Sequence, residues 1–86
     1  MTIQEIRDSL AFIQDVWARA CTLNQPLHSL KTQADCLISG LESLHLKAHL
    51  VRDERTQLEI EALTEAIEAE CVERWITGDT VHFTAH

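Results

Sequence analysis

The chain has 86 residues, of which 45% are hydrophobic and 24% charged, and these proportions indicate one small globular domain. No apolar run reaches the roughly 18 residues of a transmembrane helix, and the start Met-Thr-Ile-Gln-Glu-Ile does not resemble a signal peptide. The net charge of −7 argues against direct binding to nucleic acid or to anionic membranes, because both require an excess of Lys and Arg. Only two Gly and one Pro are present, which favours an all-α fold over a turn-rich β fold.

The first predicted helix covers residues 2–23. Thr2 is a suitable N-cap, with Glu5 three residues later as in a capping box. Apolar residues recur at intervals of three and four, the spacing of a packed helix. They are Ile3, Ile6, Leu10, Ile13, Trp17 and Ala20. Phe12 and Val16 widen this apolar arc, so we expect the helix to contact two neighbours.

The second predicted helix covers residues 26–52, with Pro26 in its first turn. Eight consecutive a/d positions are apolar, which is the strongest structural pattern in the chain. They are Leu27, Leu30, Ala34, Leu37, Leu41, Leu44, Ala48 and Val51. We expect the middle of this seam to form the core and to complete it through a homodimer. The four residues assigned to that role are Leu30, Leu37, Leu41 and Leu44.

The third predicted helix covers residues 54–77 and ends at Gly78, which leaves residues 78–86 as an extended tail. Two apolar stripes run along it, on opposite sides. The main stripe contains Ile60, Leu63, Ile67, Cys71 and Trp75, and the weaker one contains Leu58, Ala62, Ala69, Val72 and Ile76. A helix with two apolar sides either lies between two neighbours or offers one side to another chain.

The acidic residues are concentrated in this third helix, since residues 53–79 hold nine acidic and two basic side chains. Such a block is either a solvated surface or a surface directed at a basic partner. We expect the second apolar stripe and its neighbouring glutamates to bind a protein partner. The predicted partner-binding residues are Leu58, Glu65, Glu68, Val72, Glu73 and Ile76.

A metal-binding bundle is one alternative. Glu42, His45 and His49 have the spacing Glu-x-x-His-x-x-x-His, which places them on one side of a helix. Carboxylate and imidazole groups in such an arrangement can ligate Zn or Fe. A half-buried, hydrogen-bonded histidine beside the leucine seam is the competing interpretation.

A second alternative comes from His28-Ser-Leu-Lys31, which resembles the His-x-Leu-Lys-Gly core of histidine phosphotransfer domains. The segment 67–70 (Ile-Glu-Ala-Glu) is also similar to the closing helix of that family. The resemblance implies a helical bundle in which His28 carries the phosphoryl group and Lys31 helps to hold it. Thr32 stands where the family has Gly, and the matched core covers four residues.

Three cysteines, Cys21, Cys36 and Cys71, form no CxxC pair and indicate reduced thiols in a cytoplasmic protein. No base has the spacing needed to activate a nucleophile, so we expect neither enzymatic activity nor a cofactor. The interpretation that the sequence favours is a single all-α domain over residues 1–77, a three-helix antiparallel hairpin or bundle completed by dimerisation. We expect it to inhibit, sequester or chaperone a protein partner, as small phage or plasmid inhibitors do.

Overall fold

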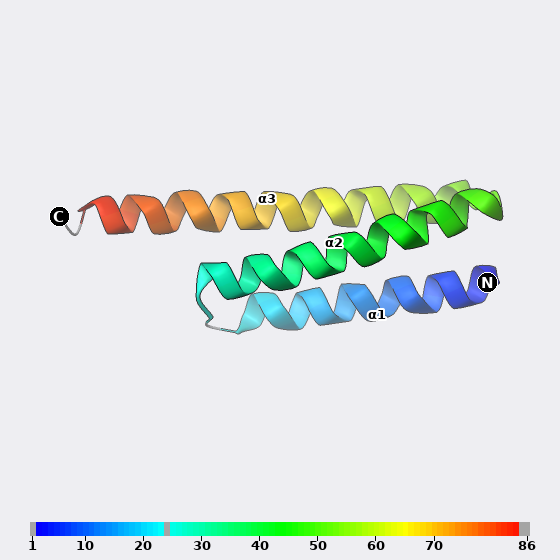
Figure 1. The fold of residues 1–86 in the computed structure, drawn as a ribbon, viewed down its shortest axis with the longest axis horizontal. Helices are drawn as coiled ribbons and strands as arrows, with labels where there is room; N and C mark the ends of the chain where they lie inside the picture. Colours follow the sequence, from blue (N-terminus) through cyan, green and yellow to red (C-terminus); the bar gives the residue numbers. More distant parts are fainter. Residues whose placement is uncertain (1, 24, 85–86) are drawn as a thin grey trace.

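Three helices make up the computed structural model, which describes the backbone of residues 2–23 and 25–84 and side chains as far as Trp75. They are α1 (Ile3–Thr22), α2 (Leu27–Leu50) and α3 (Glu54–Thr84), and successive helices run antiparallel (Figure 1). The predicted all-α, three-helix architecture is confirmed. Within the described residues, no helix combines the length and apolar character needed to cross a bilayer.

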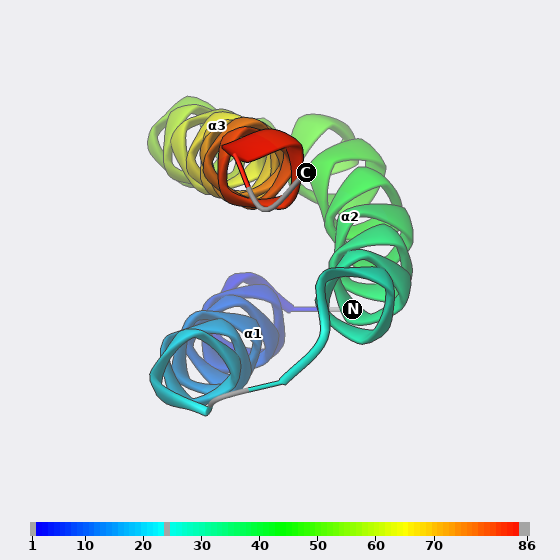
Figure 2. The same cartoon turned by 90° about the vertical axis from the view of Figure 1, so that its left-hand side faces the viewer.

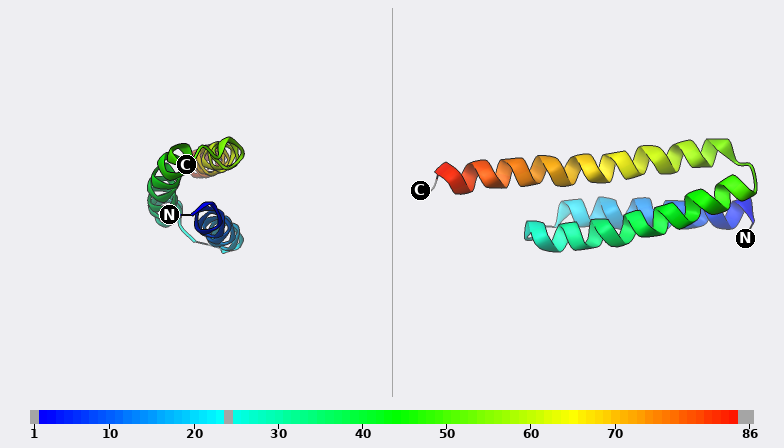
Figure 3. Two further views of the ribbon diagram at one scale, coloured as in Figure 1. Left: turned by 90° about the vertical axis from the view of Figure 1, so that its right-hand side faces the viewer. Right: turned by 45° about the horizontal axis from the view of Figure 1, so that its top comes forward.

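Helix α2 lies between the other two helices. Viewed end-on, α1 and α3 both pack against α2, whereas they meet each other in few places (Figures 2 and 3). The molecule is elongated, with extents of 53 × 18 × 15 Å. Helix α3 is the longest, and its C-terminal turns project past the connection between α1 and α2 (Figure 1).

The leucine seam of α2 forms the centre of the core, as its periodicity predicts. Leu30, Leu41 and Leu44 are buried against α1 and α3, and a buried leucine contributes about 1.5–3 kcal/mol to folding. From the other helices, the core includes Ile6, Leu10, Trp17, Ala20, Ile60 and Ile67. These three leucines are therefore covered by the other two helices within one chain. Leu37, the fourth seam residue, is half-buried.

The start of α1 and the α2–α3 connection follow from local chemistry. The Thr2 hydroxyl accepts a 3.2 Å hydrogen bond from the Glu5 amide, which confirms Thr2 as the N-cap of α1. At the end of α2, Arg52 adopts a left-handed conformation with φ of 58°. The Arg52 amide bonds to the His49 carbonyl and the Asp53 amide to the Ala48 carbonyl, which is a Schellman motif.

The boundaries of the helices differ from the predicted ones by at most two residues, except at the end of α3. Pro26 precedes α2 instead of lying in its first turn. Helix α3 does not end at Gly78, because its backbone remains helical to Thr84, and the predicted extended tail is wrong for residues 78–84. A single helical glycine costs only about 1 kcal/mol relative to alanine, whereas each further helical residue adds a backbone hydrogen bond. Residues 85 and 86 of the predicted tail lie outside the described residues.

Trp75 is the one member of the main α3 stripe that the structure leaves exposed, at 58%. It lies beside Leu27, the first residue of α2, in a shallow groove that both residues line. The packing surface of α2 ends at this point, so no further turn of α2 is present to cover the indole. Trp75 therefore continues the main stripe by its position on the helix but is not part of the core.

Candidate protein-binding surface

The side of α3 that faces away from the core carries the second apolar stripe. Leu58 and Val72 are 66% and 56% exposed, and Ala62 and Ala69 between them are exposed as well. Leu58 and Ala62 are four residues apart and Ala69 follows Ala62 by seven, so they share one side of the helix, while Ile60 and Ile67, also seven apart, lie on the opposite, buried side. The stripe is uncovered in the single chain, as predicted.

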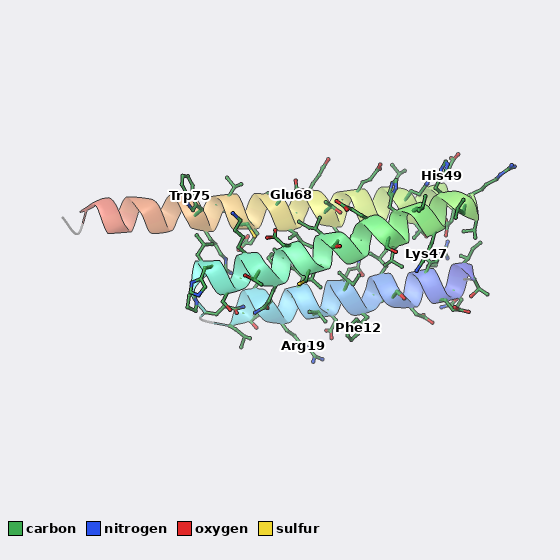
Figure 4. The ribbon with its side chains drawn as sticks, in the orientation of Figure 1. Phe12, Arg19, Lys47, His49, Glu68 and Trp75 are labelled. Atoms are coloured by element: carbon green, nitrogen blue, oxygen red, sulfur yellow. The ribbon has the colours of Figure 1, made fainter. Side chains whose placement is uncertain are left out.

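Glutamates border this stripe along its whole length. Glu65 falls within it, and exposed glutamates lie at its edges, namely Glu59, Glu61, Glu68 and Glu73. Figure 4 shows Glu68 on the side of α3 turned away from α2. We call this surface the acidic face and define it as Leu58, Ala62, Glu65, Ala69 and Val72 with those four bordering glutamates. The last predicted residue, Ile76, has its side chain outside the described part.

A groove of about 380 Å³ separates the acidic face from α2. Leu41 and Ile60 are the apolar residues that line it, and its carboxylates come from both helices. Glu42 comes from α2, and Glu61 and Glu65 come from α3. We call this feature the α2–α3 groove. The sequence did not reveal it, because its residues converge only when α2 and α3 pack in their observed register.

His45 also lines the α2–α3 groove, and its Nε2 lies 3.3 Å from Oε1 of Glu61 on the neighbouring helix. This interhelical pair agrees with the interpretation of a half-buried, hydrogen-bonded histidine. Among the residues that the structure describes, no three His, Cys, Asp or Glu side chains converge as metal ligands. Glu42 and His45 share the groove, but His49 does not line it, and the spacing of the three therefore does not produce a ligand set.

The segment that resembles a phosphotransfer core lies in the first turns of α2. His28 and Lys31 are both exposed, and the Thr32 hydroxyl donates a 2.9 Å hydrogen bond to the His28 carbonyl. Lys31 also lines the groove that contains Leu27 and Trp75. Phosphotransfer through His28 remains an alternative prediction.

Two of the three thiols are half-buried and face conditions that disfavour the thiolate. Burial, followed by the negative charge of Glu70, raises the pKa of the Cys21 thiol. Burial, followed by the charge of Asp35, likewise raises the pKa of the Cys71 thiol. Only the thiolate is an effective nucleophile, so neither cysteine is suited to covalent catalysis. Cys36 is exposed on α2.

Comparison with known proteins adds no relative: no protein-family model matches the chain, and no curated protein or solved structure matches it significantly.

Proposed function

We propose that this protein binds another protein, one with a basic surface, through the acidic face of α3. The observation that carries the proposal is the exposed apolar stripe bordered by glutamates on both sides. A surface helix needs one buried stripe for its own fold, and α3 has that stripe at Ile60 and Ile67. The second stripe, from Leu58 to Val72, has no role in the fold of the single chain and matches the apolar centre and charged border of a protein interface.

The two components of this surface have different physical roles. The large apolar side chains provide most of the affinity, because they are desolvated when a partner covers them. The glutamates accelerate association with a basic partner and disfavour acidic ones. This combination favours a partner segment with apolar residues on one side and Lys or Arg at the edges, such as a basic amphipathic helix.

The α2–α3 groove extends the same surface with a position for one basic side chain. The head group of that Lys or Arg would meet the carboxylates of Glu61 and Glu65. By covering a basic surface in this way, the protein would act as an inhibitor, adaptor or chaperone in the cytoplasm.

The proposal is tested with a synthetic helical peptide that carries Leu on one side and Lys at both edges. Chemical shifts of the backbone amides, followed during titration, should change along α3 between Leu58 and Val72 and around the α2–α3 groove. A scrambled peptide of the same composition and charge serves as the control and should bind at least about tenfold more weakly. Equal binding of the two peptides, or shifts confined to α1, would show that the acidic face is not the site.

Two variants separate the apolar from the electrostatic contribution. Val72→Asp should reduce peptide binding while α-helicity is retained, because Val72 is exposed in the single chain. Replacing Glu65, Glu68 and Glu73 by Lys should weaken binding and remove most of its salt dependence. The matched control replaces three exposed acids elsewhere, Asp8, Asp35 and Glu54, and should preserve much more of the binding.

A further inference from the structure

Another exposed apolar side chain lies on α1, away from the acidic face. Phe12 on α1 is 68% exposed. Glu5 precedes it by seven residues and Arg19 follows it by seven, and a step of seven returns to nearly the same side of a helix. In Figure 4, Phe12 and Arg19 project from the same side of α1, away from α2 and α3.

Beside Phe12, a groove of about 540 Å³ runs between α1 and α2, and we call it the α1–α2 groove. On the α2 side it is lined by two small residues, Cys36 and Gly40, and by two leucines, Leu37 and Leu44. Asp8 is the only charged residue among those that line it. A groove with small residues on one wall and an exposed aromatic ring on the other has room for a further aromatic side chain.

The distribution of charge along the chain indicates which partner would bind at the α1–α2 groove. Residues 1–52 carry five acidic and five basic side chains, whereas residues 53–86 carry nine acidic and two basic ones. Two copies of this chain would repel each other if they met through α3, but not if they met through the neutral surface formed by α1 and α2.

We propose that a second copy of this chain docks on α1 in antiparallel orientation, with the two-fold axis beside Phe12. In this arrangement each Phe12 ring enters the α1–α2 groove of the other copy. Positions at equal distances before and after residue 12 face each other across the axis, so Glu5 of each copy meets Arg19 of the other. A parallel arrangement would instead place Glu5 opposite Glu5 and Arg19 opposite Arg19, which is unfavourable.

The charges near this axis are compatible with the pairing. The Arg19 side chain is 78% exposed and pairs with Asp15 at 3.1 Å, which leaves guanidinium donors available for a second carboxylate. The Asp8 carboxylate accepts a 2.8 Å hydrogen bond from the side-chain amide of Gln4, so this acid already has a partner within α1. The homodimer therefore uses the outer side of α1 together with the α1–α2 groove, whose α2 side includes Leu37 and Leu44.

The first test is the mass in solution, measured by sedimentation at increasing concentration. Wild-type protein should approach twice the 9.8 kDa of one chain, and Phe12→Asp should remain at 9.8 kDa with unchanged helicity, because Phe12 is exposed in the single chain. A wild-type mass of 9.8 kDa at millimolar concentration would overturn the proposal. So would a dimer that Phe12→Asp leaves intact.

The second test concerns the antiparallel register. Arg19→Glu and Glu5→Arg should each raise the dimer dissociation constant about tenfold, since each creates two like-charge contacts. The double variant exchanges the two charges and should restore the wild-type constant. Arg55→Glu, which makes the same change of charge on α3, is the control for net charge and should preserve the dimer. A double variant no tighter than the single ones would overturn the antiparallel pairing.

Discussion

Arg74 of α3 donates a 2.9 Å hydrogen bond from Nη2 to the backbone carbonyl of Cys21, in the last turn of α1. The last carbonyls of a helix have no intrahelical donor, so the guanidinium satisfies one of them. The Nε of Arg74 also donates a 2.7 Å hydrogen bond to Glu70, which holds the side chain in place. Because α1 and α3 meet in few places, this contact is important for fixing the first helix relative to the third.

Replacement of Arg74 by Ala should therefore lower the free energy of unfolding by about 1–2 kcal/mol, as expected for a half-buried, charge-assisted hydrogen bond. Urea titration followed by circular dichroism measures the change. Arg55→Ala is the matched control, because the Arg55 side chain is largely exposed and pairs with Glu59 on its own helix. Its effect should stay within about 0.5 kcal/mol. Equal effects of the two variants would show that the contact with Cys21 contributes nothing.

Stability should decrease in acid through Asp53, the buried N-cap of α3. The Thr56 hydroxyl donates a 2.6 Å hydrogen bond to Asp53, and this bond lowers the pKa of the Asp53 carboxyl. Burial opposes the shift, whereas Arg7, whose Nε lies 3.5 Å from Oδ2 of Asp53, lowers the pKa further. A carboxyl whose pKa is lower in the folded state stabilises the protein fully above its unfolded pKa of about 3.9. The stabilisation by Asp53 is lost as the pH falls from the unfolded pKa through the lower pKa of the folded state.

The variant Asp53→Asn keeps an acceptor at the N-cap but removes the titrating group. Its thermal midpoint, measured between about pH 5 and pH 2, should depend less on pH than that of the wild type. Parallel curves for the two proteins would mean that Asp53 titrates alike in the folded and unfolded states, contrary to the geometry.

Gly40→Ala should stabilise the folded monomer by about 0.5–1 kcal/mol, because alanine favours the helix and restricts the unfolded chain. A β-carbon at this position would lie 3.6 Å from the Cδ1 atom of Ile13, which is an ordinary van der Waals distance. The change is best measured by urea unfolding in the Phe12→Asp background, where dimerisation does not contribute. A loss of stability would mean that α1 and α2 approach each other more closely than observed.

The three thiols should react with iodoacetamide at different rates. In the Phe12→Asp monomer, Cys36 should be alkylated first because it is exposed, while burial and a raised pKa slow Cys21 and Cys71. Peptide mass spectrometry after timed quenching gives the individual rates. Preferential labelling of Cys21 or Cys71 would contradict the packing of α3 on the rest of the chain.

The core and the exposed stripe of α3 were predictable because both depend only on helical periodicity. Leu30, Leu41 and Leu44 form the buried seam, while Leu58 and Val72 remain exposed. The helix period separates the two stripes of α3, whereas the exposure of Trp75 at the end of the main stripe depends on where α2 begins.

Features that depend on the packing of distant segments were not predictable. Thr56 is fully buried although polar, and its hydroxyl accepts a 3.4 Å hydrogen bond from Nε of Arg7 on α1. The pair of His45 with Glu61 and the hydrogen bond from Arg74 to Cys21 each join two helices, so they require the packing register. The end of α3 was missed because Gly78 is a local signal, and propagation of the helix outweighed it.

The central position of α2 has a consequence for the kinetics of folding. Most interhelical contacts join helices that are consecutive in the chain, through connections of only a few residues, and little of the core depends on α1 meeting α3. A chain with such a low contact order closes short loops first and folds on the microsecond-to-millisecond timescale typical of helical bundles. The pair α2 and α3 shares the most extensive packing, so we expect it to form the folding nucleus on which α1 docks.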